Sequence, residues 1–309
     1  MAGGAVMLMK KVDDYLALRR TAGYALEVPE YHLRNFARFA SQRKETLIRT
    51  PTVIQWASQA PSLNQREHRL QVVLRFARHL QAEDPRHEVP PRGIFRRKRT
   101  RRTPYIWTSR EVSSLLEAAA RLGPHDSLRP HVYSTLFALL HVTGLRISEA
   151  LALEFDDFDS ETLLVRETKF KKSRRIPLHQ TTAAGLQRYI ERRRRVTTEH
   201  EFLLISVRGQ RLDRSSVSWV FRRLLKSIGL SPGRQGRQPR IHDLRHAFAT
   251  RALETSPEGR DSIGRHMLAL STYLGHANIS DTYWYLEATP TLMRDIAGAC
   301  EAHMTGSVR

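Results

Sequence analysis

The sequence predicts a mainly helical protein with one small β-hairpin, divided into an N-terminal helical domain and a C-terminal mixed α+β domain. Three observations support this prediction. Apolar residues recur at helical spacing through most of the chain, a proline-rich basic segment interrupts them after residue 84, and one later stretch has the pattern strand, polar turn and strand. We therefore place the domains at residues 1–84 and 106–309, joined by a basic linker at 85–105.

The N-terminal domain is predicted to be a four-helix bundle. Apolar faces run from Val12 to Leu16 and from Leu33 to Ala40, from Thr52 to Ala57 after Pro51, and from Leu70 to Leu80. The last helix also carries arginines on its polar side: Arg66, Arg69, Arg75 and Arg78. These arginines could contact a nucleic-acid groove or only solvate the helix, and the charge of the whole chain favours the contact.

The linker combines four prolines with six basic side chains between Arg96 and Arg102. Proline lacks the backbone N–H that a helix needs, and like charges repel one another. The segment is therefore predicted to be extended. It would be solvated, would lie along a phosphate backbone, or both.

The C-terminal domain begins with a helix whose N-cap is Thr108 or Ser109, with Glu111 in its first turn. Helices from about Pro130 to Val142 and from Ile147 to Leu153 follow. The stretch from Leu163 to Leu178 predicts a hairpin with a basic tip. Further helices are predicted at about 181–195, 213–228, 241–254, 278–287 and 289–303.

The composition points to a polyanionic partner. Lys and Arg number 51 against 31 Asp and Glu, which gives a formal net charge of +20. A hydrophobic content of 40% supports sizeable cores, unlike a basic ribosomal protein, and no apolar run is long enough to span a membrane. The N-terminus does not resemble a secretory signal, and Cys300 is the only cysteine, so neither a disulfide framework nor a cysteine zinc site is predicted. A cytoplasmic protein is expected.

Three short motifs carry the candidate chemistry. They place Arg146 in TGLRISEAL, His242 and Arg245 in HDLRH, and His276 and Tyr285 nine residues apart in LGHANISDTYWY. Together they predict a cationic pocket with one phenol at its edge, which suits attack by tyrosine on a phosphate.

Each motif taken alone has a simpler explanation. His242 and Arg245, three apart on a helix, could be an ordinary core or surface pair. Arg146 with Glu149 could be a surface ion pair worth a few tenths of a kcal/mol. Tyr283 is a rival phenol, but residues two apart on a helix point to nearly opposite sides, so only one of Tyr283 and Tyr285 can face the pocket.

These motifs, in this order and with the basic hairpin TKFKKSRRIPL between them, resemble the tyrosine recombinases, also called the phage integrase family. The resemblance covers about residues 105 to 300. The N-terminal helices and the linker resemble the core-binding domain and connector of that family. The stretch from LSTYLGH to DTYWYLEATP is similar to recombinases carried by bacterial transposons and insertion elements.

The resemblance implies that Tyr285 attacks a scissile phosphodiester, forming a 3′-phosphotyrosine and freeing a 5′-hydroxyl. Bond energy is conserved, so rejoining needs no ATP. Arg146 and Arg245 would hold the non-bridging oxygens, while His242 and His276 would donate hydrogen bonds or assist proton transfer. Lys169 matches the lysine that protonates the leaving oxygen, with two neighbouring lysines, Lys171 and Lys172, as rivals.

The family also implies double-stranded DNA as partner, a homotetramer on paired sites, alone or with other recombinases, and no metal or cofactor. Two other functions compete: a non-catalytic DNA-binding accessory factor and a monomeric type IB topoisomerase. The full set of site residues disfavours the accessory, and the separate helical N-terminal domain disfavours the topoisomerase. One departure is a longer segment between Arg245 and His276, whose insert from Thr255 to Gly264 is expected to be a surface loop.

Overall fold

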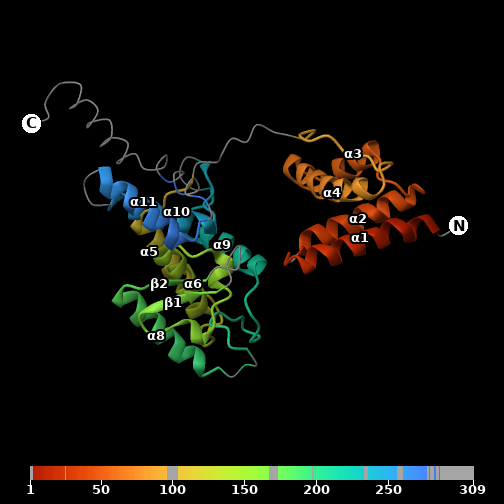
Figure 1. Ribbon diagram of the computed structural model, residues 1–309. Helices are drawn as coiled ribbons and strands as arrows, with labels where there is room; N and C mark the ends of the chain where they lie inside the picture. Colours follow the sequence, from red (N-terminus) through yellow and green to blue (C-terminus); the bar gives the residue numbers. More distant parts are fainter. Residues whose placement is uncertain are drawn as a thin grey trace, which may run out of the picture. The chain divides into compact units, whose positions relative to one another are not determined.

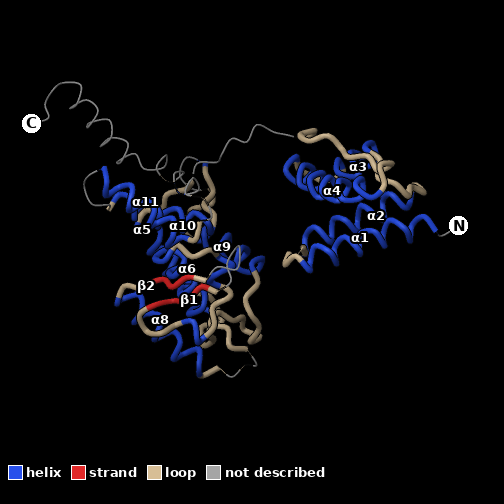
Figure 2. The backbone as a smooth tube through the Cα atoms, in the orientation of Figure 1, coloured by secondary structure: helices blue, strands red, loops and turns tan. Residues whose placement is uncertain are grey.

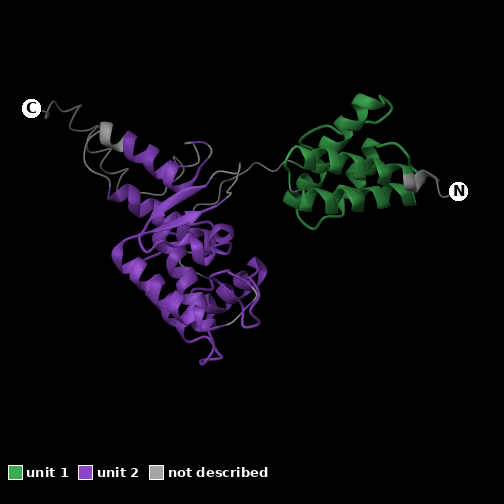
Figure 3. Cartoon of the chain, turned by 60° about the horizontal axis from the view of Figure 1, so that its bottom comes forward, with its two compact units in different colours: residues 1–101 green, residues 102–309 purple. Residues whose placement is uncertain are grey.

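The computed structural model describes residues 3–24, 26–95, 104–166, 173–196, 198, 200–232, 236–255, 260–276, 278, 282 and 285. The chain divides into two compact units, Met1–Arg101 and Arg102–Arg309 (Figure 3). Each unit has its own cluster of buried apolar side chains. No helix in the described ranges is long and apolar enough to cross a membrane.

Unit 1 contains the four predicted helices: α1 (Gly3–Thr21), α2 (Glu27–Gln42), α3 (Thr50–Ser58) and α4 (Leu63–Glu83) (Figure 1). Their apolar faces meet around Trp56, which is fully buried. The Trp56 indole N–H donates to Asn35 Oδ1 at 2.7 Å, so its one polar group is satisfied inside the bundle. Ser62 caps α4 by accepting a hydrogen bond from the backbone N–H of Gln65.

Part of the segment predicted as an extended linker instead packs on unit 1. His87 is fully buried, and its Nδ1 accepts a hydrogen bond from the backbone N–H of Ile48 at 3.0 Å. Val89 and Phe95 also pack against the apolar cluster of this unit. The prediction of an extended linker rested on its prolines and charges, and it did not consider that these three side chains could pack in a core. The six basic residues from Arg96 to Arg102 lie outside the described residues.

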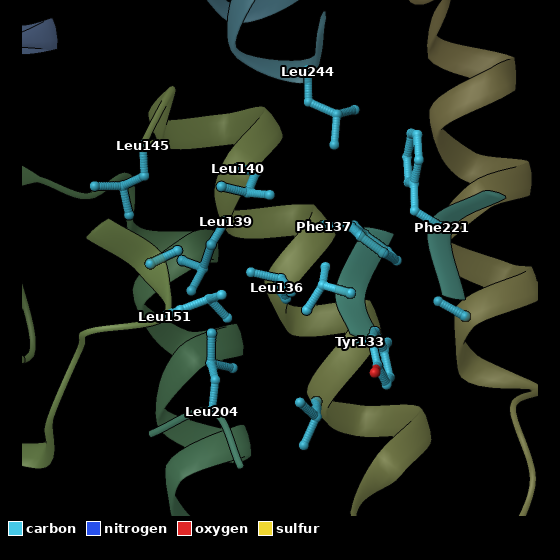
Figure 4. Close-up of a cluster of buried hydrophobic side chains, with 14 of the residues drawn as sticks. Tyr133, Leu136, Phe137, Leu139, Leu140, Leu145, Leu151, Leu204, Phe221 and Leu244 are labelled. Atoms are coloured by element: carbon cyan, nitrogen blue, oxygen red, sulfur yellow. The ribbon is translucent and has the colours of Figure 1, made fainter. Parts of the chain in front are cut away.

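Unit 2 is built around α6 (Arg129–Thr143), which packs against α5 (Ser109–Ala120), α8 (Gln180–Arg194) and α10 (Ile241–Glu254). Figure 4 shows the side chains of α6 in this core, where the Phe137 ring lies 5.5 Å from the Phe221 ring. Phe221 belongs to α9 (Arg214–Ser227). Because α6 contacts several helices, the end of α6 is held firmly against α10.

The hairpin has two antiparallel strands, β1 (Thr162–Val165) and β2 (Arg174–Pro177) (Figure 2). Leu163 pairs with Ile176, and both side chains are fully buried. The hairpin therefore anchors one face in the core of unit 2, while Arg174 begins the second strand. The basic tip, including Lys169, lies outside the described residues.

Most elements agree with the prediction, and two differ. The short helix α7 (Ile147–Ala150) ends three residues before the predicted Leu153. An unpredicted helix, α11 (Arg260–Leu274), takes up half of the expected surface loop from Thr255 to Gly264. Its buried Met267, Leu270 and Leu274 follow helical spacing and pack with α10. The predicted helices at 278–287 and 289–303 fall almost wholly outside the described residues.

Candidate active site

Five of the six predicted site residues are described, and the fold brings them together from distant parts of the chain. Arg146 immediately precedes α7 and lies three residues after the end of α6. His242 and Arg245 lie in the first turns of α10, and His276 follows the end of α11. Tyr285 lies nine residues beyond His276. Side-chain contacts join Arg245, His276 and Tyr285 at the centre of the site.

Two glycines let the chain turn at this site. Gly144 ends α6 with φ +62°, and a Cβ there would lie 2.5 Å from the Phe248 ring. Gly275 ends α11 with φ +66°, and a Cβ there would lie 2.8 Å from the Arg174 guanidinium. Any other residue at either position would be strained and crowded. Both turns therefore depend on glycine, and both present backbone carbonyls to the arginines of the site.

Arg245 is the structural centre of the site, with only 1% of its surface exposed. Its Nη1 donates to the carbonyl of Gly144 at 2.6 Å, and its Nη2 donates to the carbonyl of Leu274 at 2.8 Å. One guanidinium thus ties α10 to the end of α6 and to the end of α11. Burial lowers the pKa of Arg245, while the nearby Tyr285 side chain acts in the opposite direction.

His276 connects this arginine to the candidate nucleophile. Arg245 Nη2 lies 2.9 Å from His276 Nε2, and because a guanidinium only donates, Nε2 must be the acceptor. The ring N–H is therefore on Nδ1, which donates to the hydroxyl of the fully buried Thr282 at 2.7 Å. The His276 ring stacks on the Tyr285 ring, with centroids 6.0 Å apart and planes at 18°.

Tyr285 is 2% exposed and lies between two histidine rings. The His246 ring contacts it edge to face, with centroids 5.4 Å apart, and lies in turn 4.6 Å from the His242 ring. Burial first, and then His242, lower the pKa of His246 to about 3. Burial and the Arg245 charge lower the pKa of His242 to about 4. Both imidazoles are therefore neutral at neutral pH, so each can donate one hydrogen bond and accept another.

A buried carboxylate holds Arg146 in place. Glu149 Oε1 accepts from Arg146 Nη1 at 2.8 Å, and Glu149 Oε2 accepts from Arg174 Nη2 at 2.8 Å. Arg146 also donates to the carbonyl of Gly275 at 3.1 Å. The Glu149 side chain is 6% exposed, so the simpler view of this pair as a surface ion pair is wrong. Arg146 itself remains 31% exposed, which leaves its guanidinium accessible to an anion.

The sequence missed four residues that the structure adds to the site: Glu149 as a buried anchor, Arg174, His246 and Thr282. His246 was visible in HDLRH, one helical turn after His242, but no spacing marked it. Arg174 was one of several adjacent cations in the hairpin. Lys169 and its rivals Lys171 and Lys172, like Tyr283, lie outside the described residues, so those assignments stay predictions.

A groove of 680 Å³ adjoins these residues. It is lined by basic side chains and by the rim of the site, including Arg146, Arg214, Arg222, Arg240 and His242. Arg240 lines this groove and also pairs with Asp243 at 2.9 Å. The lining cations give the groove a positive potential that favours a polyanion.

Comparison with known proteins agrees with this fold. Residues 106–291 match the model of the phage integrase family, and the chain belongs to that family. The integrase/recombinase y4rB of Sinorhizobium fredii is 40% identical over 297 residues, covering 92% of this chain and 94% of the relative. The tyrosine recombinase XerD of Mycobacterium tuberculosis is 32% identical over 207 residues, covering 65% of this chain and 62% of XerD.

Solved structures show the same fold. The Tn1549 transposon integrase, solved in complex with transposon right end DNA, superposes with a TM-score of 0.63 at 18% identity, covering 94% of this chain and 98% of that one. The XerH site-specific recombinase bound to its difH substrate has a TM-score of 0.63 at 18% identity, covering 87% and 78%. At these identities the likeness concerns the fold alone.

The buried Glu149 yields a stability prediction. Burial raises its pKa, but hydrogen bonds from Arg174 and Arg146 outweigh that effect, so the pKa lies below the ordinary 4.5. A depressed carboxyl pKa contributes stability above the unfolded value and loses it as pH falls through the folded value. We expect Glu149→Gln to lower the free energy of unfolding of unit 2 at pH 7 by about 3 kcal/mol, since two guanidiniums lose their anion.

Urea unfolding of wild type and variant measures this difference, which should shrink as the pH is lowered below 4.5. Glu117→Gln is the matched control, because its carboxylate pairs with Arg121 on the surface at 3.9 Å. That variant should change stability by less than about 0.5 kcal/mol. Equal effects of the two substitutions would contradict the anchoring role of Glu149.

Proposed function

We propose that this protein is a site-specific DNA recombinase that cuts and rejoins DNA through a 3′-phosphotyrosine intermediate. The observation that carries the proposal is the contact of the Tyr285 ring with His276, whose Nε2 accepts a hydrogen bond from buried Arg245. A phenol beside a fixed guanidinium suits attack on a phosphodiester. Family membership supports the same reaction.

In this mechanism the Tyr285 oxygen forms a bond to phosphorus as the bond from phosphorus to the 5′-oxygen breaks. Arg146 and Arg245 hold the non-bridging oxygens, with directions set by their bonds to backbone carbonyls. His242, neutral in the free protein, can accept the phenolic proton or donate to the phosphate. Lys169 is proposed to protonate the leaving 5′-oxygen, and attack by that hydroxyl in reverse rejoins the strand.

Double-stranded DNA of a mobile element is the proposed substrate, acted on in the cytoplasm. The resemblance of the stretch from LSTYLGH to DTYWYLEATP to transposon-borne recombinases and the basic groove beside the site support this choice. We further propose that four protomers act on two paired sites, since one nucleophile cuts one strand and recombination requires four cuts. A non-catalytic accessory factor is the alternative, but it would have no use for a buried tyrosine contacting Arg245 through His276.

Tyr285→Phe should abolish the covalent protein–DNA adduct while leaving DNA affinity nearly unchanged, because the hydroxyl supplies chemistry and not charge. Trapping on a nicked duplex from the ends of the element that carries the gene measures the adduct. Tyr283→Phe is the matched control and should retain it. An adduct that survives in the first variant and is lost in the second would reassign the nucleophile.

Arg146→Ala and Arg245→Lys should slow cleavage about 100-fold or more, while binding weakens far less. Binding rests on many phosphate contacts, so one arginine is a small fraction of it. Cleavage rate and duplex affinity are measured on the same substrate, with circular dichroism to confirm folding. The wild-type reaction should proceed in EDTA, and a strict requirement for a divalent metal would contradict this mechanism.

Truncation after Ala288 removes the segment from Thr289 to Ala302, whose Leu292, Met293 and Ile296 form an apolar stripe in the sequence. We expect the stripe to dock on a neighbouring protomer. The truncated chain should then bind a half-site as a monomer but form no higher complex and no recombinant product. Native gel shifts on paired sites measure both, and assembly by the truncated chain would contradict the proposal.

A further inference from the structure

Helix α9 presents an exposed basic face that the catalytic residues do not use. The exposed cations of this helix are Arg214, Arg222, Arg223 and Lys226. Within the described part of the chain, none of these four cations forms an ion pair with an acidic side chain. The helix's own cap, Asp213, is engaged with the backbone N–H groups of Ser215 and Ser216. Arg222, Arg223 and Lys226 lie within about 100° of one another around the axis of this 14-residue helix and form a strip of uncompensated positive charge. Arg214, nine residues before Arg223, lies on the opposite side of the helix from it.

A tryptophan lies in the middle of this basic face. Trp219 is 52% exposed, and the Arg223 guanidinium carbon lies 5.4 Å from its ring centroid. At 3.6 residues per turn, Arg222 lies to one side of Trp219 and Arg223 to the other, with Lys226 about two turns further along. An exposed aromatic ring that contacts one cation and has other cations beside it can bind a polyanion that also presents apolar groups.

The same helix reaches the active-site groove. Arg214 and Arg222 line that groove together with Arg146 and His242. A duplex whose backbone enters the groove would therefore bring its adjoining base pairs to α9. The width of a single helix fits the major groove of B-DNA, where the thymine methyl group is an apolar contact that distinguishes bases.

We propose that Trp219, held by Arg223, reads the sequence beside the scissile phosphate by packing on a thymine methyl group in the major groove. Arg222, Arg223 and Lys226 contact the flanking phosphates, which fix register without reading bases. This inference rests on the proposed function, since it names how that substrate is recognised. It assigns sequence preference to an exposed side chain outside the catalytic set.

Selection of duplexes from a random library tests the proposal, because it recovers the preferred site from the protein itself. Wild-type protein should enrich a consensus, and Trp219→Ala should lose preference at one or two adjacent positions of it. For the wild-type consensus, Trp219→Ala should lower affinity about tenfold or more, with a change below about twofold for unrelated DNA. Arg223→Gln should weaken binding to both the consensus and unrelated DNA, and it should lower the number of counterions released on binding by about one.

Replacing single thymines of the consensus by uracil removes the methyl group alone. One such replacement should weaken wild type several-fold and leave Trp219→Ala unchanged. The matched controls are Leu268→Ala, which changes an apolar side chain on α11 that is 59% exposed, and Arg188→Gln on α8. Neither should alter the consensus.

Three results would overturn the inference. The first is an unchanged consensus and affinity in Trp219→Ala. The second is that Trp219→Ala loses self-association in the absence of DNA, which would make the face a protein contact. The third is the absence of any wild-type consensus. The consensus could depend on Trp219 while the wild-type protein never forms a covalent adduct. That result would support this inference and reject the proposed catalysis.

Discussion

The architecture of the site depends on one buried guanidinium. Arg245 donates to carbonyls at the ends of two different helices and to His276, so its position is fixed by groups that are far apart in the sequence. A cation with 1% exposure would be costly without these partners. Because the carbonyls are its main acceptors, the helix ends must be placed correctly before the cation can be buried. The fold and the site are thus specified by the same bonds.

The sequence was a good guide wherever a pattern was local. Four helices in unit 1, the hairpin and the main helices of unit 2 follow from apolar periodicity, and the motif residues Arg146, His242, Arg245, His276 and Tyr285 do converge. Periodicity succeeds there because a buried face repeats every turn. α11 shows the same repeat in Met267, Leu270 and Leu274, but its charged first turn masked the pattern.

What the sequence could not supply was burial and partnership across long separations. Glu149 and Arg174 are 25 residues apart, and nothing local distinguishes their bond from a solvated charge. The protonated nitrogen of His276 follows from a donor 31 residues away, Arg245. The role of Thr282 in the site is to accept the hydrogen bond from the His276 ring. Such contacts arise from tertiary packing, so only the folded chain reveals them.

The crowding of like charges has a consequence for the free protein. Burial lowers the pKa of Arg245, and the Arg146 charge lowers it further, which means that the native fold holds these two guanidiniums against mutual repulsion. An anion entering between them removes that repulsion, so the native fold binds it more strongly than the unfolded chain does. In thermodynamic terms, an anion that binds between these two guanidiniums should therefore raise the free energy of unfolding of the protein.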